Sequence, residues 1–107
     1  MNHLVKNKYM RLSRLQKFIL KTCYNSKVAT VDRVRFLEFY RGKKSPKQEL
    51  RAKIITGSIE SLIDKELMTG YGVRTPHKWF IKKVGLTGKG KKEVKRLMGE
   101  QLELKLK

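Results

Sequence analysis

Hydrophobic and polar residues alternate along this chain with two different spacings, and the first spacing predicts a helix. From residue 12 onward, apolar positions recur every three or four residues, as on one face of a helix: Leu12, Leu15, Phe18, Ile19 and Cys23. Ser13 and Gln16 have the spacing of a capping box, in which each side chain satisfies a free backbone N–H at the helix start. We therefore expect a helix from Ser13 to Asn25, with Cys23 in the core.

The next segment combines a short extended piece with a second helix. Residues 28–30 predict one short strand, and Thr30 can cap a helix that continues to Tyr40. That helix is apolar almost all round, which indicates a central position in the fold. Phe36 and Tyr40 are four residues apart and could stack on bases, but on so apolar a helix we interpret them as core. Gly42 is suited to ending the helix.

A third helix follows a turn that contains lysines. Ser45 is its predicted cap, Pro46 suits the first helical position, and Gln48 completes a second capping box. Gly57, inside this helix, costs about 1 kcal/mol relative to Ala. Such a glycine can be explained by a backbone or a phosphate that approaches closely.

The apolar residues of this third segment do not share one face. The longer stripe consists of Ile55, Ile59, Leu62, Ile63 and Leu67. Leu50 and Ile54 fall nearly opposite the centre of that stripe when the segment is placed on a single helix. We therefore expect a break, a bend or a separate short helix around residues 51–54.

The second spacing, in which every other residue lies on the same face of a strand, occurs beside Gly70 and Gly72 and predicts a β-hairpin near the end of the chain. Its strands are expected at Leu67–Arg74 and Lys78–Leu86, with the turn at residues 75–77. Thr87 then starts a last helix, whose apolar stripe is Val94, Leu97, Met98, Leu102 and Leu106. The predicted fold class is mainly α with a small β-hairpin (α+β), in one domain.

The net positive charge of the chain indicates a domain that binds a polyanion. Among 107 residues, 27 are Lys or Arg and 9 are Asp or Glu, so the formal net charge is +18. A charge of this sign and size is typical of proteins that bind nucleic acid. Cys23 is the only cysteine, and His3 and His77 have no ligand-like neighbours, so we expect no metal and no cofactor. No apolar run is long enough to span a membrane or to serve as a signal peptide, so we expect a cytoplasmic protein, associated with the nucleoid or, if viral, in the host cell.

The order helix, short strand, helix, helix, hairpin, helix resembles the winged helix-turn-helix family of DNA-binding proteins. The resemblance covers residues 12–98 and is closest to small multiple-antibiotic-resistance-type and archaeal or viral regulators. Its most specific parts are Ser58–Met68, which resembles the end of a recognition helix, and Leu86–Gly90, which resembles the return of the wing into a terminal helix. The family usually has Gly where Glu66 stands. Residues 1–11 contain Lys6, Lys8 and Arg11 but no acidic residue, so we expect a basic arm there. The resemblance implies a winged-helix domain at 12–88 and a terminal helix at 89–107 as a candidate homodimerisation element.

The resemblance, with the charge, also implies where double-stranded DNA would bind. The candidates on the recognition helix are Lys53, Thr56, Gly57, Glu60 and Ser61. Those in the wing are Arg74, His77 and Lys78, and Trp79 is interpreted as packing. The candidate phosphate contacts are Lys43, Lys44 and Lys47 at a helix start. The terminal helix could instead pack back onto the first helix.

The sequence leaves two binding functions open and argues against catalysis. The favoured one is a sequence-specific transcription regulator that places a helix in the major groove. The alternative is a nonspecific architectural DNA-binding protein or an RNA- or ribosome-associated one, since the electrostatic contribution does not depend on sequence. An enzyme is not expected, because the acidic residues are scattered and only Glu60, Asp64 and Glu66 cluster.

Overall fold

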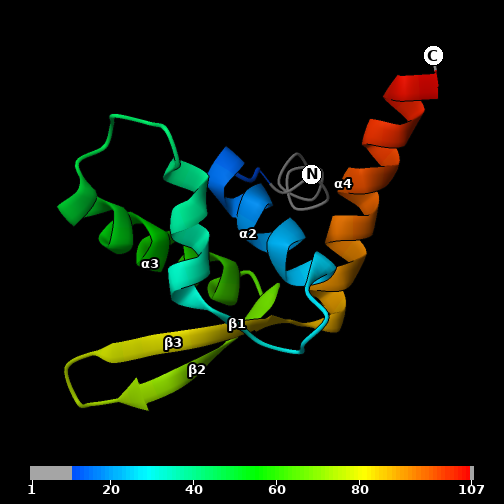
Figure 1. Ribbon diagram of the computed structural model, residues 1–107. Helices are drawn as coiled ribbons and strands as arrows, with labels where there is room; N and C mark the ends of the chain where they lie inside the picture. Colours follow the sequence, from blue (N-terminus) through cyan, green and yellow to red (C-terminus); the bar gives the residue numbers. More distant parts are fainter. Residues whose placement is uncertain (1–10, 107) are drawn as a thin grey trace, which may run out of the picture.

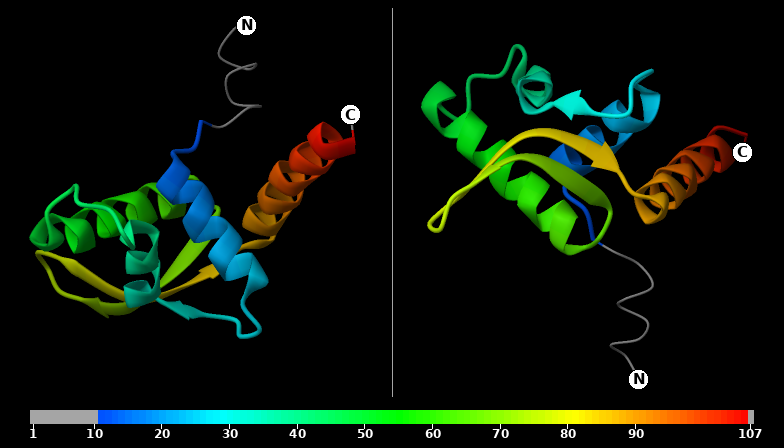
Figure 2. Two further views of the ribbon diagram at one scale, coloured as in Figure 1. Left: turned by 45° about the horizontal axis from the view of Figure 1, so that its top comes forward. Right: turned by 90° about the horizontal axis from the view of Figure 1, so that it is seen from below.

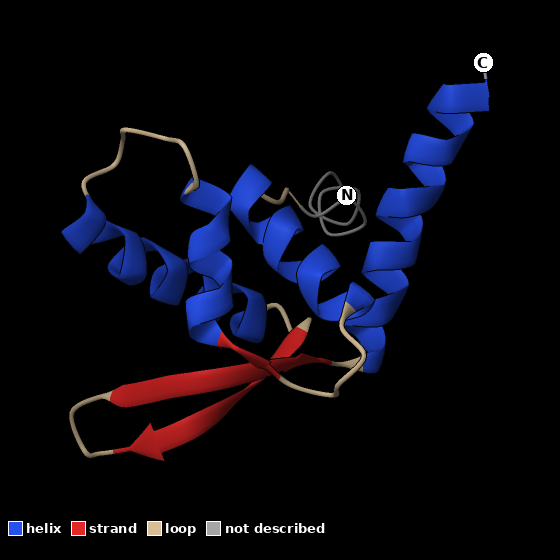
Figure 3. Cartoon of the chain, in the orientation of Figure 1, coloured by secondary structure: helices blue, strands red, loops and turns tan. Residues whose placement is uncertain are grey.

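The computed structural model describes residues 11–106, arranged as helices on one side of a small sheet (Figure 1). The elements in chain order are α2 (Arg14–Asn25), β1 (Val31–Asp32), the 3-10 helix η1 (Arg33–Tyr40), α3 (Gln48–Asp64), β2 (Met68–Arg74), β3 (Trp79–Leu86) and α4 (Gly88–Leu106). The strands form an antiparallel sheet in the order β1-β3-β2. Figure 3 shows the helices above the sheet and the far end of α4 extending away from the other elements. The predicted α+β fold class is confirmed. Of the predicted basic arm, residues 1–10 lie outside the described residues.

Helix α2 begins as predicted. The Ser13 hydroxyl accepts from the Gln16 backbone N–H at 3.1 Å, and the Gln16 side chain accepts from the Ser13 N–H at 3.0 Å. Leu15, Ile19 and Leu20 are buried on its inner face. The capping box therefore fixes the helix start, and the apolar stripe fixes the face that packs on the core.

The short strand and second helix differ from the sequence prediction. The strand is Val31–Asp32 rather than residues 28–30, because Val31 is buried and pairs with Val84. Asp32, not Thr30, caps η1 by accepting from the Val34 N–H at 3.1 Å.

Helix η1 is also less central than predicted. Its buried residues are Phe36 and Tyr40, which confirms that these two aromatic side chains belong to the core. Val34 and Leu37 remain 61% and 37% exposed. An apolar run therefore need not be buried on all sides when the helix lies at the edge of the core.

Helix α3 is continuous, so the predicted break around residues 51–54 is wrong. Leu50 and Ile54 lie on its exposed side, while Ile55, Ile59 and Leu62 are buried. The prediction failed because it required every apolar residue to face a core.

The predicted Ser45 cap and second capping box are also wrong. Lys47 occupies the N-cap position without a side-chain cap bond. Arg51 holds the preceding turn instead, donating to the backbone oxygens of Pro46 at 2.9 Å and Lys43 at 2.7 Å. Gly42 ends the preceding segment with φ +74°, as its position suggested.

The β-hairpin has the predicted boundaries to within one residue. Its pairing runs from Met68 opposite Leu86 to Arg74 opposite Trp79, with an irregularity that leaves Lys82 as an extra residue on β3. This β-bulge resets the alternation, so that Ile81 and Val84 are both buried although they are three residues apart. The bulge thereby keeps both ends of β3 packed on the core.

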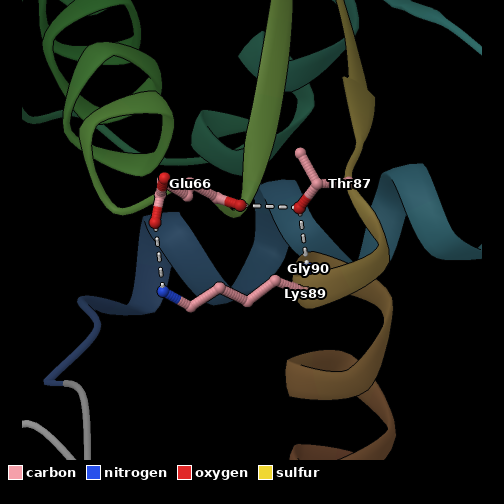
Figure 4. Close-up of polar contacts among 4 residues, drawn as sticks. All are labelled: Glu66, Thr87, Lys89 and Gly90. Atoms are coloured by element: carbon pink, nitrogen blue, oxygen red, sulfur yellow. Dashed lines mark hydrogen bonds and ion pairs between the residues drawn. The ribbon is translucent and has the colours of Figure 1, made fainter.

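A hydrogen-bonded junction joins the end of α3 to the start of α4 (Figure 4). Glu66 has φ +65°, the left-handed conformation that glycine adopts most readily, which explains why glycine is usual here in the family that the sequence resembles. The Thr87 hydroxyl donates to the Glu66 backbone oxygen at 2.6 Å and accepts from the Gly90 N–H at 3.0 Å. Lys89 lies 3.7 Å from the Glu66 carboxylate. Thr87 therefore caps α4, at the helix start that the sequence predicted, and its bond to Glu66 ties the base of the hairpin to the end of α3.

The first half of α4 packs on the core. Val94 and Leu97 are buried and Met98 is packed against the same cluster, as the apolar stripe predicted. The side chains of Leu102 and Leu106 lie outside the described residues. Both views in Figure 2 show the far end of the helix projecting from the body.

Candidate nucleic-acid interface

A groove of about 730 Å³ separates α3 from the outer part of β3. It exists because β1 pairs only with Lys83 and Val84, so the Trp79–Ile81 part of β3 has β2 on one side and no strand on the other. Its lining residues are Arg33, Glu49, Ala52, Lys53, Thr56, Gly57, Glu60, Lys78, Trp79, Phe80, Ile81 and Lys82. The hairpin and the exposed side of α3 thus form opposite walls of one open channel.

The structure brings most of the predicted helix residues into this groove. Lys53, Gly57 and Glu60 are exposed there and Thr56 is half-buried. Ser61 is half-buried outside the groove lining, and its hydroxyl accepts from the Lys65 ammonium at 2.7 Å. The predicted residues therefore share one helix, but Ser61 lies on a different flank from the rest.

Thr56 is held by contacts within the protein. Its hydroxyl donates to the Ala52 backbone oxygen at 3.0 Å and accepts from the Arg33 guanidinium at 3.1 Å. The hydrogen bond from Arg33 to Thr56 holds Arg33, the first residue of η1, in the lining of the groove. The sequence gives no sign of this role for Arg33, because only the fold brings residues 33 and 56 together.

The wing presents cations around a turn that is ordered by its own hydrogen bonds. The Thr75 hydroxyl accepts from the Lys78 N–H at 3.0 Å, and the Thr75 N–H donates to the Lys78 oxygen at 2.7 Å. Arg74, His77 and Lys78 are all exposed, and of these Lys78 lines the groove. Lys82 also lines it, and the bulge that leaves this residue unpaired was not visible in the sequence.

Trp79 packs as predicted rather than standing free. It is half-buried against the core cluster, with the Arg74 guanidinium 4.3 Å from its ring. A side chain added at Gly70 would meet both Trp79 and Ile63. Gly70 therefore leaves the space through which Trp79 joins the hairpin to the end of α3.

Lys43, Lys44 and Lys47 are exposed at the turn that leads into α3. The ammonium of Lys43 lies 3.8 Å from the centroid of the Phe39 ring. Three positive side chains beside a helix N-terminus are electrostatically unfavourable unless an anion is near, because that end of a helix carries partial positive charge. Figures 1 and 2 show the start of α3 and the tip of the hairpin on the same side of the molecule, so this turn and the wing place cations near the same end of the groove.

Cys23 takes no part in this surface. The thiol is buried, and burial raises its pKa to about 12, against a smaller lowering effect of Arg35. A neutral thiol in the core is a poor nucleophile and a poor metal ligand, which supports the interpretation of Cys23 as a core residue.

Within residues 11–106, no group of His, Cys, Asp and Glu side chains is placed to hold a metal ion. The same residues include no helix with the length and hydropathy needed to cross a membrane.

The architecture is that of a winged helix-turn-helix: η1 and α3 form the helix pair, and β2 and β3 form the wing. Solved structures share this fold. A double mutant of ZitR from Lactococcus lactis matches with a TM-score of 0.61 and 15% identity over 88% of this chain and 56% of its own. The adhesin competence repressor AdcR from Streptococcus pyogenes matches with a TM-score of 0.60 and 14% identity over 96% of this chain and 68% of its own.

A third structure, Bacillus subtilis PadR in complex with operator DNA, has a TM-score of 0.56 and 17% identity over 82% of this chain and 48% of its own. The chain thus spans about half to two thirds of the length of these proteins. At these identities the likeness is one of fold. No protein-family model and no curated protein sequence matches the chain.

Proposed function

We propose that this protein is a DNA-binding transcription regulator that places α3 in the major groove and its wing on the adjacent backbone or minor groove. The observation that carries the proposal is the groove between α3 and β3, bordered by Arg33, Lys53, Lys78 and Lys82 in a chain of net charge +18. An α-helix fits the major groove, and a basic hairpin can reach the neighbouring strand. The fold shared with PadR, which was solved on operator DNA, supports the same arrangement.

In this proposal two groups of side chains share the task of contacting phosphates. Lys43, Lys44 and Lys47 contact them at the N-terminus of α3, and Arg74, His77 and Lys78 contact them from the wing. Each neutralised phosphate contributes about 0.9 to the slope of log affinity against log salt. The wing and the turn therefore supply affinity that is independent of sequence.

Sequence preference would come from the exposed side of α3. Lys53, Thr56, Gly57, Glu60 and Ser61 are the proposed contributors, with Glu60 able to accept from a cytosine amino group. Glu49 and Glu60 lower the net positive charge of the groove. Acidic groups beside phosphates disfavour loose backbone binding, so their presence favours a specific reader over a purely electrostatic binder.

We also propose that α4 forms a two-fold homodimer. The far end of α4 projects from the body in Figure 2. A two-fold dimer would read a near-palindromic site with half-sites one helical turn apart. The proposed protein is a non-enzymatic, cytoplasmic regulator that needs no cofactor.

Selection of bound fragments from a random duplex pool tests the function. The proposal predicts that a selected fragment stays bound against an excess of unrelated duplex and of structured RNA. If unrelated duplexes compete equally, the protein is an architectural binder; if structured RNA displaces the fragment, it is an RNA-associated protein.

A further inference from the structure

The exposed side of α3 carries two aliphatic side chains that the core does not use. Leu50 and Ile54 are 46% and 40% exposed, whereas Ile55, one residue further along, is 1% exposed. Because α3 is continuous from Gln48 to Asp64, the two residues are neighbours at i and i+4 on its N-terminal half. They form an apolar pair on the part of the helix that the proposed complex inserts into DNA.

The residues around this pair leave it accessible. Gly57 follows on the same side, and nothing lies within 4 Å of the position that its side chain would take. The nearby hydroxyl groups already have partners within the protein: Thr56 bonds Ala52 and Arg33, and Ser61 bonds Lys65. Leu50 and Ile54 are thus exposed apolar groups on this helix face that do not belong to the core cluster.

The charge of the chain decides what would cover the pair. Lys47, at the N-cap of α3, and Lys53 within it are both exposed, so a second copy of this surface would bring like charges together. A polyanion is attracted instead. The apolar group that duplex DNA presents in its major groove is the 5-methyl group of thymine, which aliphatic side chains contact.

We propose that Leu50 and Ile54 recognise thymine methyl groups in the major groove. This inference rests on the proposed function and adds to it the chemical feature of the base that is read. It predicts preference for A·T pairs under the N-terminal half of α3 without a hydrogen bond to the base.

The test compares duplexes of alternating dA·dT with duplexes of alternating dA·dU, which differ only in the thymine methyl group. Binding is followed by fluorescence anisotropy at one salt concentration. Because one buried methyl group is worth about 0.8 kcal/mol, the expected preference for the thymine duplex is about fourfold for each methyl that is contacted. The Leu50→Ala and Ile54→Ala variants are each expected to reduce that preference.

Val28→Ala is the matched control, because Val28 is 65% exposed and lies outside α3. This variant is expected to keep the full preference. Thermal unfolding confirms that the α3 variants remain folded, as expected for exposed positions.

The outcomes separate the inference from the function on which it rests. Equal affinity of the wild-type protein for the two duplexes, with binding still weakened by salt, overturns the methyl recognition and leaves DNA binding intact. A preference that survives in the double variant Leu50→Ala/Ile54→Ala assigns it to other residues and also overturns the inference. Absence of binding to either duplex, and to the selected fragment, removes the proposed function itself.

Discussion

Substitution of Gly57 by alanine should strengthen the fold and weaken DNA binding at once. Gly57 lies in the interior of α3, and no atom stands within 4 Å of the position that an added Cβ would occupy. Glycine in a helix interior is about 1 kcal/mol less favourable than alanine. Gly57→Ala should therefore raise the free energy of unfolding by about 1 kcal/mol, and the Tm by about 4–8 °C for a domain of this size.

The same methyl group occupies the surface that the proposal places against DNA. Overpacking of a close-fitting contact costs about 1–3 kcal/mol. That range corresponds to a loss of affinity of about five- to 150-fold. The two effects have opposite signs, so a general loss of structure cannot produce both.

Calorimetry and fluorescence anisotropy on the selected duplex measure the two effects. Gly99→Ala is the matched control, because Gly99 also lies within a helix with nothing within 4 Å of an added Cβ. It should gain stability and keep its DNA affinity, and sedimentation velocity shows whether it alters the proposed dimer. If Gly57→Ala is more stable but binds DNA as tightly as the wild type, the interface is not on this face of α3.

Three further outcomes follow from named features of the structure. Glu66→Gly should raise the free energy of unfolding by about 1 kcal/mol in urea titrations, because glycine relieves the strain of a left-handed backbone. Glu66→Ala removes only the exposed ion pair with Lys89 and should not raise the free energy of unfolding. Equal stability of the two variants would contradict the reasoning. Because burial raises the pKa of the folded Cys23 thiol to about 12, its stabilising effect should be constant below about pH 9 and be lost as the pH rises towards 12. A thiol reagent at neutral pH should accordingly modify Cys23 only at the rate of unfolding, and rapid stoichiometric labelling of the folded protein would refute its burial. Lys78→Ala should weaken binding to all duplexes and lower the salt slope by about one unit, whereas Glu60→Ala should relax sequence preference; anisotropy titrations that show the same change for both would disprove the division of tasks.

Local signals in the sequence predicted the parts of the fold that depend on neighbours along the chain. The Ser13 capping box, the hairpin turn at residues 75–77 and the helix start at Thr87 each involve hydrogen bonds between residues three positions apart. Short-range sequence patterns encode such local hydrogen bonds.

The features that the sequence did not predict depend on tertiary contacts. Helix α3 continues through Leu50 and Ile54 because Arg51 and the buried side of the helix hold it, while the exposed side is free to carry apolar groups. Strand β1 lies at Val31 rather than three residues earlier because its register is set by Val84 on a distant strand. Neither the continuity of α3 nor the position of β1 could be predicted from local periodicity.

The candidate site divides in the same way. The lysines of the turn and the wing were recognisable from charge beside a helix start and a hairpin tip. Arg33 and Lys82 enter the groove only through a contact with Thr56 and through a bulge in β3. The exposed pair on α3 was visible in the sequence, but its significance depended on knowing that the helix is unbroken.

Directed cleavage of DNA tests the central claim most directly, and the chain is suited to it because Cys23, its only cysteine, is buried. A Lys53→Cys variant carries an iron chelate that cuts DNA close to its attachment point, and Lys95→Cys on α4 provides the matched control. The account predicts cuts from position 53 confined to the major groove over a few adjacent base pairs of the selected fragment, and no such cuts from position 95. Cuts from position 53 that fall in the minor groove, or their absence from a DNA complex that has formed, would contradict it.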